Sequence, residues 1–426
     1  MVTRTTPAEN RGPRSPASPY NPPVISVSQA LAALANLEPL GVEEVPLAEA
    51  AGRVLAREIR ADEDWPPFET SAMDGYAVLL GDVAEAGREL RERARLVAAG
   101  DSPPAPIASG EAVRVMTGAP LPANAEAIIP VERATRKAER VRFEVAPRMG
   151  DHIRHKGESI AAGNMLAPAG RRLGAVGVAL AAMAGVDPVP VYRRPRISIA
   201  VTGNELVPAS ATPRPGQLRD SNGPMLAALC RERGWSAARR DRVADDAAGV
   251  ERLFAEAGRS EDLLLTTGGV SAGDLDLLPA AAEKAGFSLL FHGVSLRPGK
   301  PVAFGRRGAT LWLGLPGNPV STAVCFHLFA REAAGRLEGD TIAAAPRITA
   351  RLEGRLAAPG QRETYCDGRW TTADGESRVE PLTSAGSHDI GAFARANALI
   401  RLPAGSAALG KGDTVECLLL NADSET

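Results

Sequence analysis

The chain has 426 residues, which is more than one hydrophobic core usually serves, so several domains are expected. Its 49 basic and 51 acidic residues nearly cancel, so the overall charge gives no support to a role on nucleic acid or on a membrane surface. The cysteines lie far apart and form no CxxC pair, which excludes a disulfide framework and a zinc site of that spacing (Cys230, Cys325, Cys366 and Cys417). Reduced thiols in a cytoplasmic protein are therefore expected.

The N-terminal part of the chain changes its pattern several times. Residues 1–23 are rich in Pro, Ser, Asn and Arg and predict a disordered tail. Ala and Leu at helical spacing predict a helix over 27–39, and a second helix is expected over 47–57. Short β-rich pieces between Pro and Gly turns predict a small β domain over 61–154. Helical spacing returns over 172–185, and no apolar run approaches the roughly 20 residues that a membrane span needs.

From residue 196 onward, strands alternate with helices, which predicts a parallel sheet with helices on both faces. The expected strands are 196–201, 236–243, 262–267 and 309–315, and the expected helices are 221–234, 245–258, 274–286 and 318–335. Gly234 is expected to end the first of these helices, with Ser221 or Asn222 as its N-cap. After residue 346 the pattern returns to short strands and turns.

These patterns together predict a multi-domain protein of class α/β plus β. The expected domains are a tail over 1–23, a discontinuous helical linker domain over 24–60 and 155–192, an inserted β domain over 61–154, a three-layer α/β domain over 193–345, and a β-barrel-like C-terminal domain over 346–422.

The stretch "LLLTTGGVSAGDLD", residues 263–276, begins as a buried strand and ends in glycines and two carboxylates. In an open α/β sheet, ligands bind where strands end, and glycines let the backbone approach an anion closely. Asp274 and Asp276 repel phosphate, so a divalent cation such as Mg²⁺ is expected to bridge them to it. The alternative is a plain turn in which Asp274 caps the next helix.

Three further loops have a similar composition. "TGNEL" follows a strand and carries Glu205, "RPGK" places Arg297 and Lys300 on a Pro-Gly turn, and "LPGNPVS" ends a strand before a helix that Asn318 is expected to cap. Each loop alone is weak evidence. Because loops at one edge of a sheet converge, the set favours a binding site.

The chain resembles the molybdopterin molybdenumtransferases, also called molybdenum insertases, which are similar to the E domain of gephyrin. The matching stretches include "SAMDGYAV", "MTGAPLPANAEAIIPVE", "IRHKGESI", "TGNEL", "RDSNGPML", "TTGGVSAGDLD", "RPGKPVAFG", "LPGNPVS" and "SAGSHDIGAFARANALI", in this order over residues 25 to 420. The resemblance implies an enzyme with elongated four-domain subunits that form a homodimer.

The implied substrates are molybdate and adenylylated molybdopterin, with Mg²⁺ as the cofactor. The implied reaction hydrolyses the pyrophosphate link, releases AMP and inserts molybdate into the dithiolene. A tungstate-using variant is an alternative. The upstream adenylyltransferase and the recipient molybdoenzymes are the implied partners, besides the second subunit, and neither nucleic acid nor membrane is expected.

The resemblance also implies roles for individual residues. The implied catalytic acids are Asp74, Glu205, Asp274 and Asp276, of which Asp274 and Asp276 would hold the metal. Substrate binding is implied for Thr117, Asp220, Ser221, Asn222, Gly268, Gly269, Ser271, Pro298, Gly317 and Asn318. Molybdate is a dianion that suits cations and hydroxyls, and the implied molybdate-binding residues are Arg297, Lys300, Ser321, Arg362 and Ser387.

Three positions depart from the family pattern. Ser159 stands where an acid is usual, Arg297 where lysine is common, and Asn204 where Asp is frequent. Rival interpretations are the related adenylyltransferase, a scaffold that keeps the fold for partner binding, and a nucleotide pyrophosphatase. Two β regions that flank the α/β domain count against the first, the "MDGYA", "GGVS" and "RPGK" stretches count against the second, and Arg362 and Ser387 count against the third.

Overall fold

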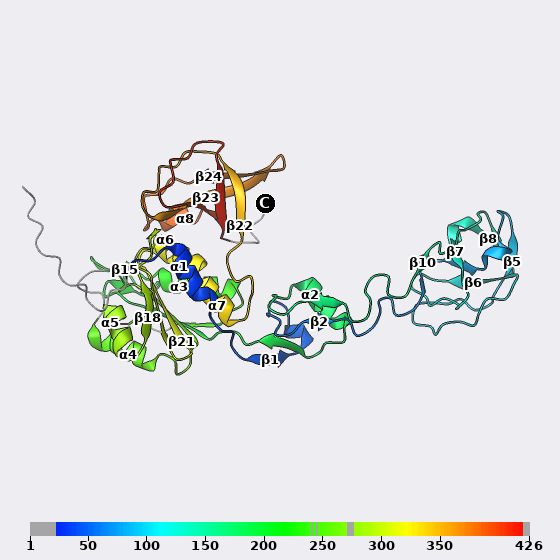
Figure 1. The fold of residues 1–426 in the computed structure, drawn as a ribbon, viewed down its shortest axis with the longest axis horizontal. Coiled ribbons are helices and arrows are strands. Elements are labelled where there is room, and N and C mark those ends of the chain that lie inside the picture. Colours follow the sequence, from blue (N-terminus) through cyan, green and yellow to red (C-terminus); the bar gives the residue numbers. More distant parts are fainter. Residues whose placement is uncertain (1–22, 240–241, 244–245, 271–276, 421–426) are drawn as a thin grey trace, which may run out of the picture.

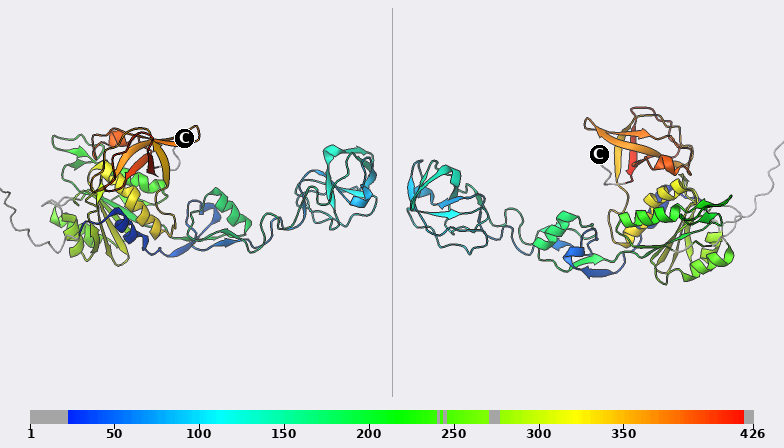
Figure 2. Two further views of the ribbon diagram at one scale, coloured as in Figure 1. Left: turned by 45° about the horizontal axis from the view of Figure 1, so that its top comes forward. Right: turned by 180° about the vertical axis from the view of Figure 1, so that it is seen from behind.

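The molecule is elongated, with an α/β domain at one end and a small β domain at the other (Figure 1). The computed structural model describes residues 23–239, 242–243, 246–270 and 277–420. The C-terminal β domain lies against the α/β domain, and a short linker module that contains α2 joins both to the distant β domain. Two further views show the same arrangement (Figure 2). The expected multi-domain α/β plus β class is therefore confirmed.

The α/β domain contains a six-stranded sheet in the order β16-β13-β17-β21-β20-β18. Its strands are β13 (Ile197–Val201), β16 (Ala237–Arg239), β17 (Leu263–Thr267), β18 (Ser288–His292), β20 (Ala303–Arg307) and β21 (Thr310–Leu315). The first four in the sheet order are parallel, but β20 is antiparallel to both β21 and β18. The sheet, which was expected to be of parallel type, is mixed because β20 and β21 form a hairpin across Gly308, which has φ +57°.

Helices cover both faces of this sheet, because side chains alternate between the two faces of a strand. One face packs α1 (Val27–Ala35), α3 (Asn222–Glu232), α6 (Pro319–Cys325), a π-helical segment (Phe326–Ala330) and α7 (Arg331–Leu337). The other face packs α4 (Ala247–Glu256) and α5 (Leu277–Lys284). In β17, Leu263 and Leu265 face the first group, and Leu264 faces the second.

The linker module consists of short pairs of strands around α2 (Ala175–Met183). β1 (Val42–Val45) pairs with β12 (Val189–Tyr192), and β2 (Ile59–Arg60) pairs with β11 (Met165–Ala167). The helix expected over 47–57 was wrong, since only the 3-10 turn Leu47–Glu49 forms. Gly52 has φ +73°, and Val54 and Leu55 form bridges with Arg172 and Val191, so the backbone there pairs across the module rather than with itself.

The distant domain is a six-stranded sheet in the order β7-β4-β6-β5-β9-β8. Its strands are β4 (Gly75–Val78), β5 (Glu89–Glu92), β6 (Glu111–Val115), β7 (Ala127–Pro130), β8 (Ala134–Lys137) and β9 (Arg140–Phe143). The chain enters and leaves it through the paired strands β3 (Thr70–Ser71) and β10 (Ile153–Arg154).

The C-terminal domain is a five-stranded barrel, because β23 pairs with both β24 and β25 and so closes the sheet. Its strands are β22 (Arg347–Leu352), β23 (Glu363–Ala373), β24 (Glu376–Pro381), β25 (Ala398–Leu402) and β26 (Thr414–Leu419), with the short helix α8 (Ile390–Phe393) between β24 and β25. The strand β19 (Leu296–Arg297) comes from the preceding domain and pairs in parallel with the start of β23. This pairing ties the barrel to the α/β domain.

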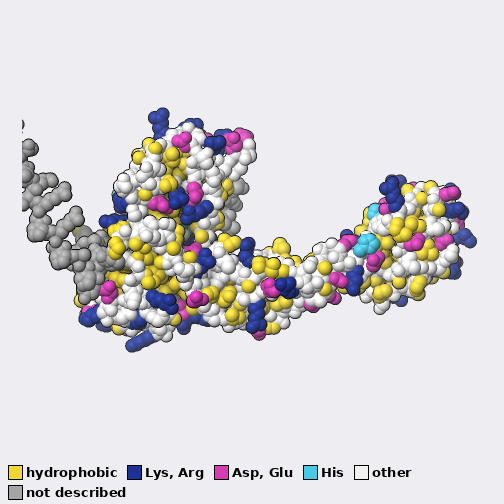
Figure 3. Space-filling model, in the orientation of Figure 1, with side chains coloured by type: hydrophobic (Ala, Val, Ile, Leu, Met, Phe, Trp, Pro, Cys, Tyr) yellow, Lys and Arg dark blue, Asp and Glu magenta, His cyan; other side chains and the backbone are white. Residues whose placement is uncertain are grey.

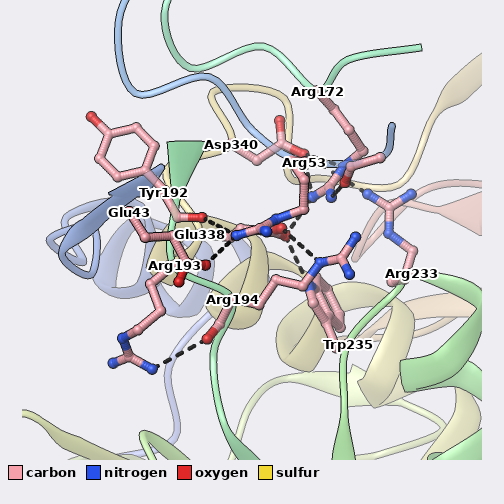
Figure 4. Close-up of polar contacts among 11 residues, drawn as sticks. Glu43, Arg53, Arg172, Tyr192, Arg193, Arg194, Arg233, Trp235, Glu338 and Asp340 are labelled. Carbon is pink, nitrogen blue, oxygen red and sulfur yellow. Dashed lines mark hydrogen bonds and ion pairs between the residues drawn. The ribbon is translucent and has the colours of Figure 1, made fainter. Parts of the chain in front are cut away.

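The linker module is held to the α/β domain by buried ion pairs (Figure 4). Arg172 from the linker module binds Glu338 at 2.7 Å and Asp340 at 3.1 Å, just after α7. Glu338 is fully buried and also accepts a hydrogen bond from Trp235 Nε1 at 2.8 Å. Arg194 lies 3.6 Å from the same carboxylate.

Acidic and basic side chains are interspersed over the visible face of the molecule, in keeping with the near-zero net charge (Figure 3). Among the described residues, the structure contains no helix with the length and apolar character to span a bilayer.

Candidate active site

A cleft opens where three parallel strands of the α/β sheet end. It has a volume of about 710 Å³ and is called the strand-end cleft here. Thr202, Gly203 and Glu205 follow β13 on its wall, while Gly268, Gly269 and Val270 follow β17. Of the residues named from the sequence, it is lined by Glu205, Asp220, Ser221, Asn222, Gly268, Gly269, Gly317, Asn318 and Ser321. The expected convergence of the loops thus occurs in the structure.

The backbone at Gly268 requires glycine. Its φ is +90°, and a Cβ atom there would lie 2.6 Å from the carbonyl oxygen of Thr202. Gly269 also has a positive φ, of +61°. The loop therefore presents bare backbone to the cleft.

A buried polar network holds the loops of the strand-end cleft together. Thr267 Oγ1 donates to the carbonyl oxygen of Pro316 at 2.9 Å. Asn222 Nδ2 donates to Thr267 Oγ1 at 3.0 Å and to the carbonyl oxygen of Gly317 at 2.7 Å. Asn222 Oδ1 is buried without a hydrogen-bond partner in the described part of the chain.

Two expected helix caps differ from the structure. Ser221 is the N-cap of α3 but makes no side-chain capping bond; instead Asp220 Oδ1 accepts from the N–H of Gly223 at 2.9 Å. Asn318 is the N-cap of α6, and its side chain also makes no capping bond. Asn318 Nδ2 donates instead to Ser387 Oγ of the C-terminal domain at 2.9 Å. The side chain of Asn318 thus serves a tertiary contact, which a local sequence pattern does not reveal.

A second cavity, the interdomain pocket, lies between the α/β domain and the barrel and has a volume of about 750 Å³. The pairing of β19 with β23 sets Arg297 opposite Thr364. Thr364 is two residues from Arg362 in the sequence, so the pairing brings the backbone at Arg297 near that at Arg362. Of the residues named from the sequence, the pocket is lined by Arg297, Pro298, Lys300, Asn318, Ser321, Arg362 and Ser387. Within the described residues, neither arginine nor Lys300 has an ion-pair partner, so their charge is available to an anion.

The two cavities adjoin each other. Pro301, Asn318, Ser321 and His388 line both of them. Sequence reasoning missed Thr202, Thr267, Pro301 and His388 among the lining residues. Thr202 and Thr267 lie at strand ends, and this position is the sequence signal for such a role. His388 carries no such signal, because it comes from the C-terminal domain.

Asp74 and Thr117 lie together, but in the distant β domain. Asp74 Oδ1 accepts hydrogen bonds from Thr117 N at 2.7 Å and from Thr117 Oγ1 at 2.8 Å. These bonds, with a smaller contribution from the charge of Arg114, lower the pKa of Asp74. The domain that carries this pair lies at the opposite end of the molecule from the α/β domain (Figure 1).

Three other residues expected in the site, Ser271, Asp274 and Asp276, lie outside the described residues. Their predicted roles stay predictions. Val270, the last described residue before them, lines the strand-end cleft.

Comparison with known proteins covers nearly the whole chain. Three family models match: the MoeA N-terminal region (domain I and II) over residues 25–185, a probable molybdopterin binding domain over 198–336, and the MoeA C-terminal region (domain IV) over 349–420. The chain is similar to the molybdopterin molybdenumtransferase of Nostoc sp., with 34% identity over 427 residues that cover 96% of this chain and 97% of that protein. The corresponding protein of Bacillus subtilis is 32% identical over 94% of this chain and 95% of its own length.

A solved structure is also similar over its whole length. The crystal structure of the molybdopterin biosynthesis moea protein from Pyrococcus horikosii has a TM-score of 0.78 and 29% identity, covering 94% of this chain and 100% of that chain. The similarity therefore extends over the flanking β regions as well as the α/β domain, which counts against a single-domain adenylyltransferase.

Proposed function

The chain belongs to the molybdopterin molybdenumtransferase family, enzymes of the final step of molybdenum cofactor synthesis, and on that premise we propose the reaction in detail. The protein inserts molybdate into adenylylated molybdopterin, with Mg²⁺-dependent hydrolysis of the pyrophosphate link and release of AMP. One observation carries the proposal: a glycine-lined cleft at strand ends adjoins a pocket that contains cations without acidic partners among the described residues.

The strand-end cleft suits the phosphate-linked part of the substrate. Gly268 and Gly269 allow close approach of the backbone to phosphate oxygens. Asn318 lies where the two cavities meet. In this arrangement the pyrophosphate and the dithiolene of one substrate occupy neighbouring cavities.

The donor set suits Mg²⁺, which prefers carboxylate oxygens. Glu205 supplies an exposed carboxylate to the cleft, and Asp274 and Asp276 follow Val270 closely in the sequence. When bound by Asp274 and Asp276, Mg²⁺ neutralises charge on the pyrophosphate. No group of three or more metal-binding side chains occurs among the described residues, so these two aspartates are essential to the proposal.

Molybdate binds in the interdomain pocket. Arg297 and Arg362 offer planar donors for oxyanion oxygens, Lys300 offers a point charge, and Ser321 and Ser387 offer hydroxyls. Ser387 is positioned from two sides, because its carbonyl oxygen accepts from Val320 N at 3.1 Å while its hydroxyl accepts from Asn318. The natural oxyanion is molybdate in this proposal, with tungstate as the alternative.

Asp74 and Thr117 complete the site of a partner subunit. Their distance from the cleft of their own chain supports a homodimer in which each distant β domain reaches the other chain. The lowered pKa of Asp74 keeps it ionised, so it acts as an acceptor or base rather than as an acid.

The test uses purified protein loaded with adenylylated molybdopterin and Mg²⁺. Molybdate is added, and AMP release is followed together with reconstitution of a cofactor-free molybdoenzyme. Molybdate-dependent AMP release with reconstitution is the expected result. Tight substrate binding without turnover would instead favour a scaffold, and Ser159, in place of the usual acid, would be the first residue to restore.

Asp276→Asn tests the metal site separately. The variant should fold normally by circular dichroism but should lose Mg²⁺-dependent AMP release. Full activity in this variant would remove Asp276 from the metal site.

A further inference from the structure

Asp367 is a buried carboxyl group in the interdomain pocket that the proposed reaction does not yet use. It lies on β23 and is only 6% exposed. It lines the pocket together with Arg297, Lys300 and Arg362. Its carboxyl group nevertheless forms no hydrogen bond or ion pair within the part of the chain that the structure describes.

The neighbouring acid on the same face of the strand shows how a buried carboxylate is normally satisfied. Alternate residues of a strand share a face, so Glu363, Tyr365 and Asp367 point the same way. Glu363 accepts from Arg401 Nε at 2.8 Å and from the Tyr365 hydroxyl at 2.8 Å. Asp367 has no such donors, although it is more deeply buried.

The charged group that acts on Asp367 from the adjoining helix is an acid. Asp389 is the N-cap of α8, and its carboxylate accepts from Ala385 N and Ala392 N, each at 3.0 Å. These bonds lower the pKa of Asp389 and keep it ionised. Burial and this negative charge raise the pKa of Asp367.

Among the described residues, the other titratable groups that line the pocket with Asp367 are His388, Cys366, Tyr365 and the three cations. The charge of Arg297 acts on the thiol of Cys366 rather than forming an ion pair with Asp367. His388 lines the same pocket from the loop before α8. An unpaired buried carboxylate is costly, and an ionised one would also repel a dianionic substrate.

We propose that Asp367 is a neutral carboxylic acid when the oxyanion binds, that it donates a hydrogen bond to the oxyanion, and that it then protonates the oxygen that leaves as water. This inference rests on the proposed function, because it assumes that the interdomain pocket holds molybdate. It assigns Asp367 as a catalytic residue for the insertion step.

The proton balance of insertion requires such a group. A dithiol and molybdate give a dithiolene-bound trioxo species and one water: R(SH)₂ + MoO₄²⁻ → R(S)₂MoO₃²⁻ + H₂O. Two S–H bonds and one Mo–O bond break, while two Mo–S bonds and two O–H bonds form. Asp367 passes its proton to the departing oxygen and regains one from a thiol, so it is unchanged at the end. The oxidation state of molybdenum does not change, and no other reactant is needed.

The first test measures molybdate binding to the full chain by calorimetry as a function of pH. Wild-type affinity should fall as the pH rises through the pKa of Asp367, because the ionised group repels the dianion. Asp367→Asn is nearly isosteric and stays neutral, so its affinity should lack this fall and exceed that of the wild type by about tenfold or more at high pH. Protonation of molybdate itself is common to both proteins and cancels in the comparison.

A second variant leaves Asp367 in place. Asp389→Asn keeps a good N-cap but removes the charge that acts on Asp367, so the pH midpoint of wild-type binding should move to lower pH. In turnover, Asp367→Asn should reconstitute a molybdoenzyme about a hundredfold more slowly, because it donates a hydrogen bond but no proton. Its binding of the adenylylated substrate should be unchanged.

Different failures have different meanings. Equal gains in affinity at every pH for Asp367→Asn would show that the group is always ionised and would overturn the acid role. An unmoved midpoint in Asp389→Asn would overturn it as well. Absence of molybdate binding in wild type and variants alike would overturn the oxyanion pocket itself, and with it the proposed function.

Discussion

The buried ion pairs between the linker module and the α/β domain allow a quantitative prediction for Glu338→Gln. The wild-type carboxylate is 0% exposed and is contacted by Arg172, Arg194 and Trp235. Glutamine keeps the shape but removes the charge that the arginines need. Burial and mutual repulsion already lower the pKa of both Arg194 and Arg233, so the cluster has an excess of positive charge. Loss of a buried counter-charge costs about 3–5 kcal/mol of unfolding free energy.

The matched control is Arg194→Met. Its side chain is 35% exposed and its Nε lies 3.6 Å from Glu338, in contrast to 2.7 Å for Arg172. Removal of Arg194 also relieves repulsion within the cluster. The expected cost is therefore about 1 kcal/mol or less. In a double-mutant cycle, Arg172→Met combined with Glu338→Gln should cost less than the sum of the single changes by about 1–3 kcal/mol.

The assay is urea unfolding followed by tryptophan fluorescence. Trp235 and Trp312 both lie in the α/β domain, so Trp65→Phe and Trp370→Phe provide a background in which the signal reports that domain. This matters because a multi-domain chain does not unfold in a single two-state transition. A cost for Arg194→Met equal to that for Glu338→Gln would refute the argument, and so would a cost below about 1 kcal/mol for Glu338→Gln.

Three further predictions concern the site and the core. Gly268→Ala should lose substrate binding, because its Cβ would meet Thr202 O at 2.6 Å. Gly41→Ala should retain it, because Gly41 lies outside the cleft and its Cβ would meet no atom within 4 Å. Calorimetric titration with the adenylylated substrate distinguishes the two variants. Lys300→Ala should weaken molybdate binding but spare binding of the adenylylated substrate, and equal losses of both would show that the pockets do not act separately. His327 is buried, which lowers its pKa from 6.5 to about 3. Between these two pH values the unfolded state binds a proton at His327 and the native state does not. The free energy of unfolding therefore decreases as the pH drops from 6.5 toward 3. Urea unfolding at pH 7 and pH 5 should show that His327→Gln removes about 2 kcal/mol of the acid-induced loss.

The strand-end half of the site could be predicted from the sequence because its information is local. An apolar strand such as β17, followed at once by Gly268 and Gly269, indicates both the edge of a sheet and close backbone approach. The strands β18 and β20 were missed: β18 is an edge strand, and the segment between the two strands contains the Pro298–Gly299 turn. The expected helix over 47–57 failed because its Ala, Leu and Glu residues have good helix propensity, but tertiary pairing of Val54 and Leu55 took precedence.

The interdomain half of the site was harder to predict because it depends on docking between domains. Arg362 looks like a solvated surface charge in isolation, and the family resemblance alone identified it. His388 and Asp367 escaped notice because their position depends on β19 pairing with β23 and on α8 packing near α6. An aspartate between Cys366 and Gly368 in a buried strand is the one local signal that was available, since such a residue needs a partner or a function.

The two ends of the molecule are connected through the Glu338 cluster. The Asp74–Thr117 pair lies beyond the linker module, and that module meets the α/β domain through Arg172, Glu338 and Asp340. In the proposed dimer, the direction of the linker module therefore determines whether Asp74 reaches the cleft of the partner. Glu338→Gln should then lower turnover even under conditions where every domain stays folded, while binding of the adenylylated substrate to the strand-end cleft is retained. Such a separation of turnover from binding, with small-angle scattering showing a changed shape, would identify the buried ion pairs as the element that sets the geometry of the two-chain site.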